Sequence, residues 1–146
     1  RKFKEASLFA FLCRATKAYS SFSLDTLTQM FQIDEKDMIG HFQIGLNRRL
    51  RTAGLGRIAI APSHRGKQLA AEMMTLILNH AFAFDWVHRV DLLVYSHNEA
   101  AIRSYQSAGL VLEGTRREST PIHDEVWDTH IMSMLRHEFD KRTERE

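Results

Sequence analysis

The sequence predicts a single domain of the mixed α/β (α+β) class, with helices packed on the faces of one sheet. The hydrophobic period changes several times along the chain, between the alternation typical of strands and the longer repeat typical of helices. The length of 146 residues, with 44% apolar and 26% charged side chains, is ordinary for one globular domain. We therefore assign residues 1–146 to one domain. Because the chain starts with Arg1 rather than methionine, some N-terminal sequence can be absent.

The first half of the chain is expected to form two helices and then two strands. The helices are expected at 3–19 and 23–31, and the strands at 38–44 and 55–61. Ser23 is placed to cap the second helix, and Pro62 ends the second strand. The polar segment 47–54, which contains a cluster of arginines, predicts a solvent-exposed loop.

The second half is expected to alternate helices and strands. Helices are expected at 69–84 and from 96–98 to 109, and strands at 90–95, 110–116 and 126–135, the last two joined by 119–124. Either Ser96, with Glu99 three residues later, or Asn98 caps the later helix, which Gly109 ends. From Phe139 onward the chain is charged, so we expect it to fray.

Composition narrows the partners and the compartment. The formal net charge is only +2, and no aromatic residues are interleaved with Arg48, Arg49 and Arg51, so nucleic-acid binding is not expected. Cys13 is the single cysteine, which fits a reducing compartment and a cytoplasmic protein. No apolar run approaches the roughly 18 residues of a membrane span, so no membrane partner is expected.

The segment 57–70 has the features of an anion-binding site. A strand ends, a loop turns at Gly66 and a helix begins, which leaves unpaired backbone N–H groups and the positive end of a helix dipole. Arg65 and Lys67 add two cations, so the segment predicts binding of a phosphate or pyrophosphate, with an ordinary solvated turn as the alternative. It has neither the ending of a P-loop nor the glycines of a dinucleotide fingerprint.

Two motifs resemble those of the GCN5-related N-acetyltransferase (GNAT) superfamily. Arg65 and Ala70 match the ends of its acetyl-CoA-binding pattern Arg/Gln-x-x-Gly-x-Gly/Ala, and Gln68 stands where the family has glycine. We expect Gln68 to offer its N–H from a helical first turn, without a positive φ. A later motif, in which an asparagine opens a helix and a tyrosine precedes a glycine, is matched by Asn98, Ala101, Tyr105, Gly109 and Leu110. Residues 127–139 look like the closing strand of the ribosomal-protein N-terminal acetyltransferase branch.

The resemblance implies the GNAT fold, a mixed and mostly antiparallel central sheet with helices on both faces and a splayed central strand pair. It implies acetyl-CoA as co-substrate and no metal. The cofactor-binding residues that it implies are Ile58, Ala59, Ile60, Arg65, Gly66, Lys67, Gln68, Leu69, Ala70 and Asn98. The first three would present backbone groups to the pantetheine amides, residues 65–70 would hold the pyrophosphate, and Asn98 would lie beside the pantetheine arm. Tyr105 would be the general acid near the thioester sulfur.

The implied reaction is direct transfer of acetyl from acetyl-CoA to a primary amine, which the sequence does not identify. A protein N-terminus, a lysine, a polyamine and an aminoglycoside all fit, and a homodimer is compatible with the resemblance. Alkyl amines are mostly protonated at neutral pH, so a base is needed. The candidates, none marked by a motif, are His41, Glu113, Glu125 and Asp128.

Two other functions stay open on the sequence alone. A GNAT-fold protein could bind CoA as a sensor or regulator without turnover, a reading that Gln68 and the unmarked base favour. A nucleic-acid-associated module is the weaker alternative. His123, His130 and His137 recur every seven residues, which is not the spacing of zinc ligands on a strand. Trp86 and Trp127 are interpreted as core or substrate-edge aromatics.

Overall fold

The computed structural model describes residues 26–34 and 37–145 of the chain. The strands are β1 (Thr26–Asp34), β2 (Asp37–Asn47), β3 (Thr52–Ile60), β4 (Arg89–Tyr95), β5 (Val111–Ile122) and β6 (Glu125–Leu135). The helices are the short 3₁₀ helix η1 (Pro62–His64), α2 (Leu69–Phe82), α3 (Glu99–Ser107) and α4 (Arg136–Thr143). The helix that the sequence predicts over 3–19 lies outside the described residues.

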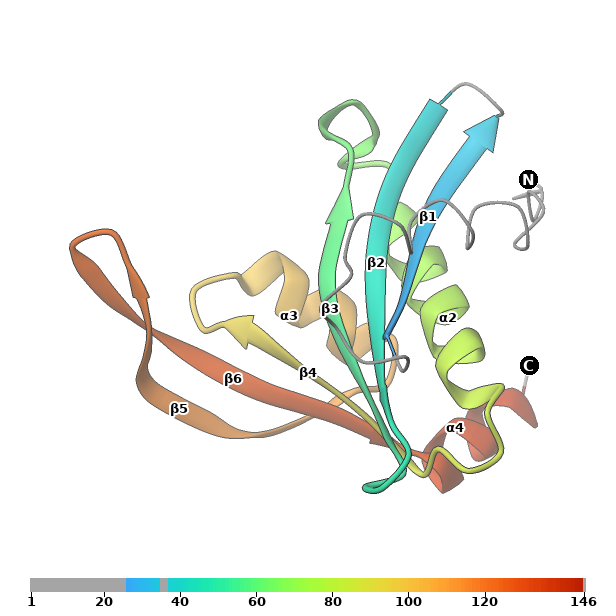
Figure 1. Ribbon diagram of the computed structural model, residues 1–146. Helices are drawn as coiled ribbons and strands as arrows, with labels where there is room; N and C mark the ends of the chain where they lie inside the picture. The colour runs from blue at the N-terminus through green and yellow to red at the C-terminus, as the bar shows by residue number, and fades with distance from the viewer. Residues whose placement is uncertain (1–25, 35–36, 146) are drawn as a thin grey trace.

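The strands form one sheet in the order β1-β2-β3-β4-β6-β5. Its neighbouring pairs are antiparallel except for β3 and β4, which are parallel. The β3–β4 pairing runs from Thr52 and Arg89 to Leu55 and Leu92. Beyond these residues the two strands diverge, as Figure 1 shows. The predicted mixed sheet with a splayed central pair is therefore confirmed.

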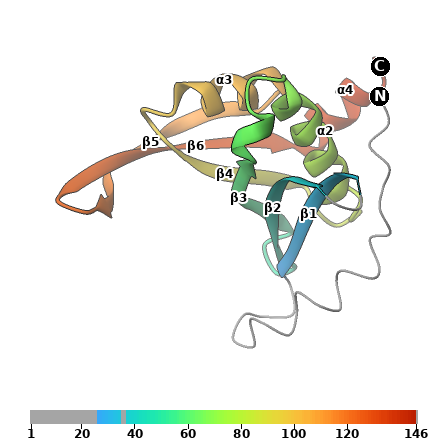
Figure 2. The same ribbon diagram turned by 90° about the horizontal axis from the view of Figure 1, so that it is seen from above.

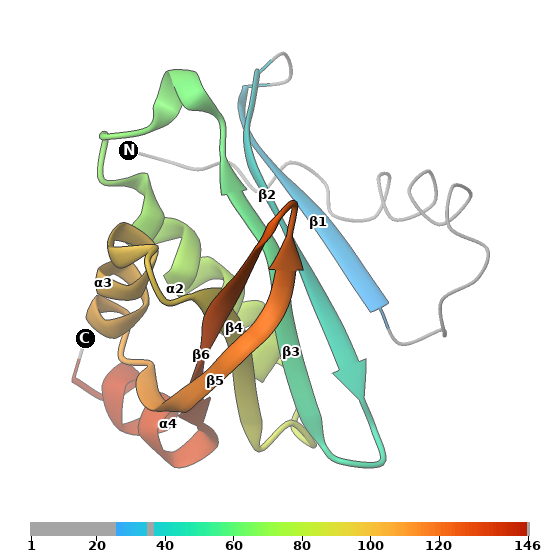
Figure 3. The ribbon, with the colours of Figure 1, turned by 90° about the vertical axis from the view of Figure 1, so that its left-hand side faces the viewer.

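The two faces of the sheet differ in what covers them. Helices α2 and α3 lie on the same face, which we call the helix face (Figures 2 and 3). Strand residues alternate between faces, and β4 turns Val90, Leu92 and Val94 toward the helices, where they are buried. The opposite face, called the second face, is defined on β4 by Asp91, Leu93 and Tyr95.

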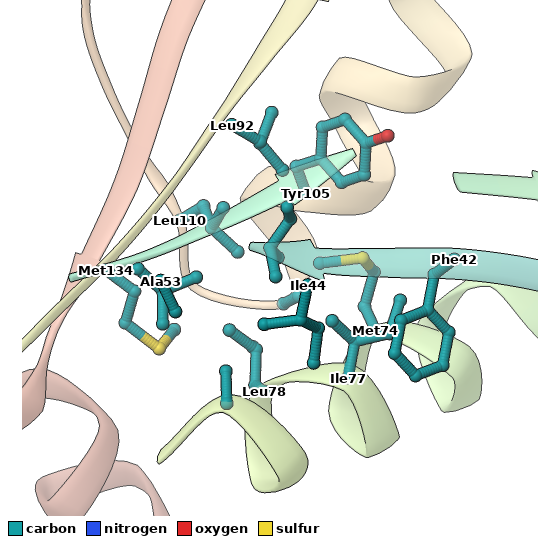
Figure 4. Packing of buried hydrophobic residues seen from close by; sticks show 14 of the residues in the cluster. Phe42, Ile44, Ala53, Met74, Ile77, Leu78, Leu92, Tyr105, Leu110 and Met134 are labelled. Carbon is teal, nitrogen blue, oxygen red and sulfur yellow. The ribbon is translucent and has the colours of Figure 1, made fainter. Parts of the chain in front are cut away.

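The hydrophobic core lies between the helix face and α2. Figure 4 shows Ile44 of β2 packed close to Ile77 and Leu78 of α2, and all three are fully or almost fully buried. Burying one side chain of this size contributes roughly 1.5–3 kcal/mol. The same packing fixes the start of α2 relative to the end of β3, and these two ends bound the predicted anion-binding loop.

Arg136, the first residue of α4, caps the C-terminal end of α2. Its guanidinium donates hydrogen bonds of 2.7–3.0 Å to the backbone carbonyls of Phe82, Phe84 and Val87 and lies 4.9 Å from the ring centroid of Phe82. Carbonyls at a helix C-terminus lack intrahelical partners and carry the negative end of the dipole. Hydrogen bonds to a charged group contribute about 1.5–3 kcal/mol each, so Arg136 anchors this end firmly.

The helix expected over 23–31 is wrong for residues 26–31, because these residues belong to β1. That strand pairs antiparallel with β2, from Thr26 opposite Gly45 to Asp34 opposite Asp37. Periodicity alone cannot separate a short apolar helix from a strand, and here the pairing with β2 decides the outcome. Strands β2 and β3 are also longer than predicted where they are joined, because β2 ends at Asn47 and β3 begins at Thr52. The loop expected over 47–54 is therefore only a turn over 48–51.

The fraying expected from Phe139 is wrong, because α4 forms there. The ring of Phe139 stacks on that of Phe82 with centroids 4.6 Å apart, and Glu138 accepts a hydrogen bond of 2.8 Å from the N–H of Leu135. Arg142 donates to the backbone carbonyl of Ala108. These tertiary contacts stabilise a helix whose composition alone is too polar to predict one.

The β5–β6 hairpin is longer than the sequence predicts. The expected connection over 119–124 is mostly strand, and the turn occupies only His123 and Asp124. Pro121 lies inside β5, which is tolerated because β5 is the last strand at its edge of the described sheet. The hairpin projects beyond the end of β4 as an arm, which Figures 1 and 2 show.

Candidate active site

The gap between β3 and β4 is the first feature of the candidate site. Beyond its last pair with β4, strand β3 continues to Ile60 with β2 as its partner. A bulge bends β3 at Arg57, whose φ is 50°. Ile58, Ala59 and Ile60 follow this bend and are half-buried. The structure therefore brings the three residues predicted to face the pantetheine arm to the edge of the gap.

The loop that follows β3 contains two residues with left-handed backbone. Gly66 has a φ of 73°, and Gln68, the N-cap of α2, has a φ of 59° and a ψ of 18°. The expectation that Gln68 needs no positive φ is wrong. The left-handed region costs a residue with a side chain about 1–2 kcal/mol, and glycine avoids this cost. Backbone geometry thus explains why glycine suits position 68.

The N-terminal end of α2 is open to solvent. Residues 65–68 are exposed, and no side chain caps the helix. The first-turn amides and the positive end of the dipole of this 14-residue helix therefore point toward the loop. Arg65 donates from Nε to the carbonyl of Ile60 at 3.1 Å, which holds its guanidinium beside the loop. Lys67 is exposed and adds a cation. The amides and the two cations fit a pyrophosphate, although Glu72 places one carboxylate in the first turn of α2.

The second predicted motif lies on α3. Asn98 Oδ1 accepts a hydrogen bond of 3.3 Å from the N–H of Ala101, so Asn98 rather than Ser96 is the cap. Tyr105 is only 9% exposed, and Figure 4 shows its ring beside Leu92, where the β3–β4 pairing ends. Burial raises the pKa of the Tyr105 hydroxyl, so this group stays protonated and able to donate a proton.

Two of the four candidate bases have strong partners. Glu113 accepts hydrogen bonds of 2.7 and 2.8 Å from Arg89 and one of 2.5 Å from Ser133. These bonds, Arg89 first, lower the pKa of Glu113 from 4.5 to about 2. Asp128 accepts a bond of 2.7 Å from the N–H of Glu118, at the bulge of β5. A carboxylate with so low a pKa is a weak base, which argues against Glu113.

The other two candidates differ in position. His41 is half-buried on β2 and pairs with Ala59 of β3, within the part of β3 that has left β4. Glu125 is exposed at the start of β6, where it accepts a hydrogen bond of 2.8 Å from Nε1 of Trp127. Of the four, His41 is the candidate that neighbours a residue predicted to contact the cofactor.

Sequence reasoning missed an aromatic cluster at the end of β4. The ring centroid of Trp127 lies 5.0 Å from that of Tyr95 and 4.3 Å from that of His97, with interplanar angles near 85° and 82°. Tyr95 pairs with Thr129 of β6 and lies on the second face. Alternation along β4 was the available signal for the face of Tyr95. The contact with Trp127 depends on the β4–β6 pairing, which no local pattern encodes.

No helix among residues 26–34 and 37–145 is long and apolar enough to cross a membrane. In the same part of the chain, no three side chains of histidine, cysteine, aspartate or glutamate are grouped as metal ligands. His123, His130 and His137 lie in a turn, in β6 and in α4, so their regular spacing does not bring them together.

The sequence of this chain is similar to those of known acetyltransferases. The Acetyltransferase (GNAT) family matches residues 8–110. A spermidine N(1)-acetyltransferase of Vibrio cholerae is 29% identical over 129 residues, which cover 86% of this chain and 74% of the relative. An L-amino acid N-acetyltransferase of Escherichia coli is 24% identical over 112 residues, which cover 75% of this chain and 69% of the relative.

Solved structures of acetyltransferases also superpose on this chain. A mutant spermidine N-acetyltransferase from Vibrio cholerae superposes with a TM-score of 0.78 at 25% identity, covering 91% of this chain and 76% of the other. A spermidine N-acetyltransferase from the same organism, in complex with CoA and spermine, gives a TM-score of 0.74 at 26% identity, covering 80% and 69%.

The chain belongs to the GNAT family of acetyltransferases. It is an acetyl-CoA-dependent N-acetyltransferase that transfers the acetyl group to an amine. This conclusion favours the enzyme over the sensor that the sequence left open. The finer assignment to the ribosomal-protein branch stays a prediction.

Proposed function

We propose that the physiological acceptor is a polyamine, an alkyl amine that carries further ammonium groups. The observation that carries this proposal is the charge of the hairpin arm. Between positions 118 and 128 the chain has no lysine or arginine and has four carboxylates, which are Glu118, Asp124, Glu125 and Asp128. A concentration of negative charge of this kind attracts polycations to a chain whose net charge is +2. The names of the spermidine-acetylating relatives support the same substrate class.

The acetyl donor would bind along the splayed half of β3. Backbone groups of Ile58, Ala59 and Ile60 would pair with the pantetheine amides as a missing strand would, because β4 has diverged there. The loop 65–70 would hold the pyrophosphate with its amides and with the cations Arg65 and Lys67. The Asn98 oxygen already caps α3, so only its NH₂ group would contact the pantetheine arm.

Tyr105 would act as the general acid. It lies beside Leu92, at the apex of the gap, and its raised pKa keeps it protonated. In the transfer step the amine nitrogen bonds to the acetyl carbon and the carbon–sulfur bond breaks, with the Tyr105 proton passing to the leaving sulfur. The proton that the amine loses would go to His41, directly or through water. Acetyl-CoA supplies the activated thioester, whose thiol leaving group has a reference pKa of about 8.5.

A competition among acceptor amines tests this function. Purified protein and acetyl-CoA would be incubated with spermidine, spermine, free amino acids and a peptide with an open N-terminus, and the released CoA thiol would be followed. We expect the highest kcat/KM with the polyamines and a monoacetylated polyamine by mass spectrometry. A higher kcat/KM with an amino acid or with the peptide would overturn the polyamine assignment.

We also propose a homo-oligomer in a reducing compartment such as the cytoplasm. A dodecameric structure is known for a spermidine N-acetyltransferase from Vibrio cholerae, which makes self-association of this chain a reasonable expectation. The single cysteine fits a reducing compartment. Sedimentation or light scattering would give the assembly size, and a monomer at working concentration would contradict the oligomer.

A further inference from the structure

We propose that Tyr95, Trp127 and Glu125 form a subsite that holds the second ammonium group of the acceptor. The subsite deepens the polyamine function proposed above and rests on it. It assigns a binding role to an aromatic cluster and a carboxylate that the acetyl-transfer chemistry itself does not use.

The position of the subsite suits a bifunctional amine. The reacting amine must meet the thioester near the apex of the gap, where β3 and β4 part after Leu92. The helix face is covered by α2 and α3, so the acceptor approaches from the second face (Figures 2 and 3). Tyr95 lies on this face three residues further along β4, which is about 10 Å at the rise of a strand. A flexible aliphatic spacer spans such a distance and places a second ammonium beside Tyr95.

The chemistry of the subsite suits an ammonium group. Aromatic faces attract cations through the ring quadrupole, and tryptophan is the strongest of the natural rings. Trp127 and Tyr95 meet edge to face with centroids 5.0 Å apart and form a corner. His97 lies against both rings, perpendicular to Trp127 at 4.3 Å and parallel to Tyr95 at 5.8 Å. Glu125 is fixed at the edge of this corner, because its Oε2 accepts the hydrogen bond of Trp127 Nε1. A positive group in the corner would contact two ring surfaces and one carboxylate.

Solvent access and local charge support binding rather than packing. Glu125 and His97 are exposed and Trp127 and Tyr95 are only half-buried, so part of each side chain is accessible to a ligand from solvent. The arm from 118 to 128 is negative, as described above. The two exposed arginines that precede it in the chain, Arg116 and Arg117, lie outside this segment, at the start of the irregularity between Arg116 and Thr120. A cluster that served only to stiffen the arm would need no carboxylate at its rim.

The test separates the two ammonium groups of the acceptor. Steady-state kinetics would compare spermidine with butylamine, which has one amine and no second charge, for Glu125→Gln and Trp127→Leu. Glu125→Gln removes the charge of an exposed side chain with little change of shape. Asp85→Asn is the control, because it removes the same charge from an exposed turn outside the arm. Trp127→Phe keeps an aromatic face and tests whether the ring itself matters.

We expect each of Glu125→Gln and Trp127→Leu to raise the spermidine KM about 5-fold, at unchanged kcat. The KM for acetyl-CoA and the kcat/KM for butylamine should stay unchanged, and Asp85→Asn should behave as the parent protein. An unchanged spermidine KM in Glu125→Gln would overturn the subsite, even if Trp127→Leu fails to fold. An equal loss for butylamine would overturn it too. A parent protein that acetylates butylamine but no polyamine would instead overturn the proposed function.

Discussion

The candidate sites on the helix face and on the second face of the sheet are built in different ways. On the helix face, the candidate donor site is built mainly from backbone: a strand edge, a left-handed loop and the amides of a helix start. On the second face, the candidate acceptor site is built from side chains, with charged pairs on β4 and β5 and aromatic rings at the end of β4.

This difference explains what a sequence can reveal about each site. A backbone site constrains residue size and φ, so it leaves glycines and small residues at fixed spacing. A side-chain site can be built from many combinations of residues, so it leaves no fixed pattern. Substitutions at the candidate donor site should therefore change the binding or the reaction of acetyl-CoA. Substitutions on the second face should leave acetyl-CoA binding unchanged.

Tyr105→Phe should give the largest effect. Removing the hydroxyl removes the proposed acid, so kcat should fall about 100-fold, the low end for general acid catalysis, because a thiol leaves with little help. Burial raises the Tyr105 pKa above its ordinary value of 10.0, so the rate of the parent protein should not fall through loss of this proton until the pH exceeds that value. An unchanged kcat in the variant, with acetyl-CoA binding intact by calorimetry, would remove Tyr105 from the mechanism.

Arg65→Glu should weaken acetyl-CoA about 30-fold in Kd, because a charge-assisted contact to the pyrophosphate is replaced by repulsion. Isothermal titration would measure the Kd. Arg49→Glu makes the same charge change in the exposed 48–51 turn and should leave the Kd unchanged. Equal losses in the two variants would mean that only the overall charge matters and that Arg65 does not mark the site.

Gln68→Gly should increase the stability of the protein and its affinity for acetyl-CoA by a small amount. Relief of the left-handed strain is worth about 1–2 kcal/mol, and the extra freedom of glycine in the unfolded chain offsets about 0.4–1 kcal/mol of it. The free energy of unfolding should therefore rise by up to about 1.6 kcal/mol, with acetyl-CoA bound up to about 5-fold more tightly. Gln68→Ala keeps the strain and should gain neither. A loss of stability in Gln68→Gly would show that the Gln68 side chain makes a stabilising contact.

Loss of the ion pair between Arg89 and Glu113 should give the smallest effect. It should change the stability of the protein and leave acetyl-CoA binding unchanged. The folded-state pKa of Glu113 is lowered, so its contribution to stability is present above pH 4.5 and is lost as the pH falls toward about 2. Both partners are partly exposed, so the effect is screened by solvent. In Arg89→Met, denaturant titrations should lose this acid-dependent component. An identical pH dependence in the parent and the variant would show that the pair is neutral for stability.

The fold was predictable where the chain has long periodic elements. Helix α2 and strands β3, β4 and β6 lie close to their predicted ranges, because each has one strongly patterned face. Two elements were missed because tertiary contacts form them: β1 depends on pairing with β2, and α4 depends on Phe139 and Arg142. Local sequence carries neither kind of information.

The candidate donor site was predictable for a different reason. Arg65, Gly66 and Tyr105 stand at the spacings of the family motifs, and the structure places them beside the gap between β3 and β4. Their roles in binding and catalysis stay predictions. The conformation of Gln68 was not predictable, because its side chain gives no sign of a positive φ. The corner of Tyr95 and Trp127 was also missed, since it exists only through the pairing of β4 with β6.

The contact of Arg136 with the end of α2 bears on how the protein is made. Arg136 follows the last strand of the sheet and lies 54 positions after Phe82, whose carbonyl it binds. During synthesis, the ribosome releases the segment that holds the acetyl-CoA loop long before it releases this arginine. The end of the helix that carries the loop therefore lacks this contact until Arg136 has emerged. Nascent chains stalled before Arg136 should leave the loop sensitive to protease, and chains extended beyond α4 should protect it.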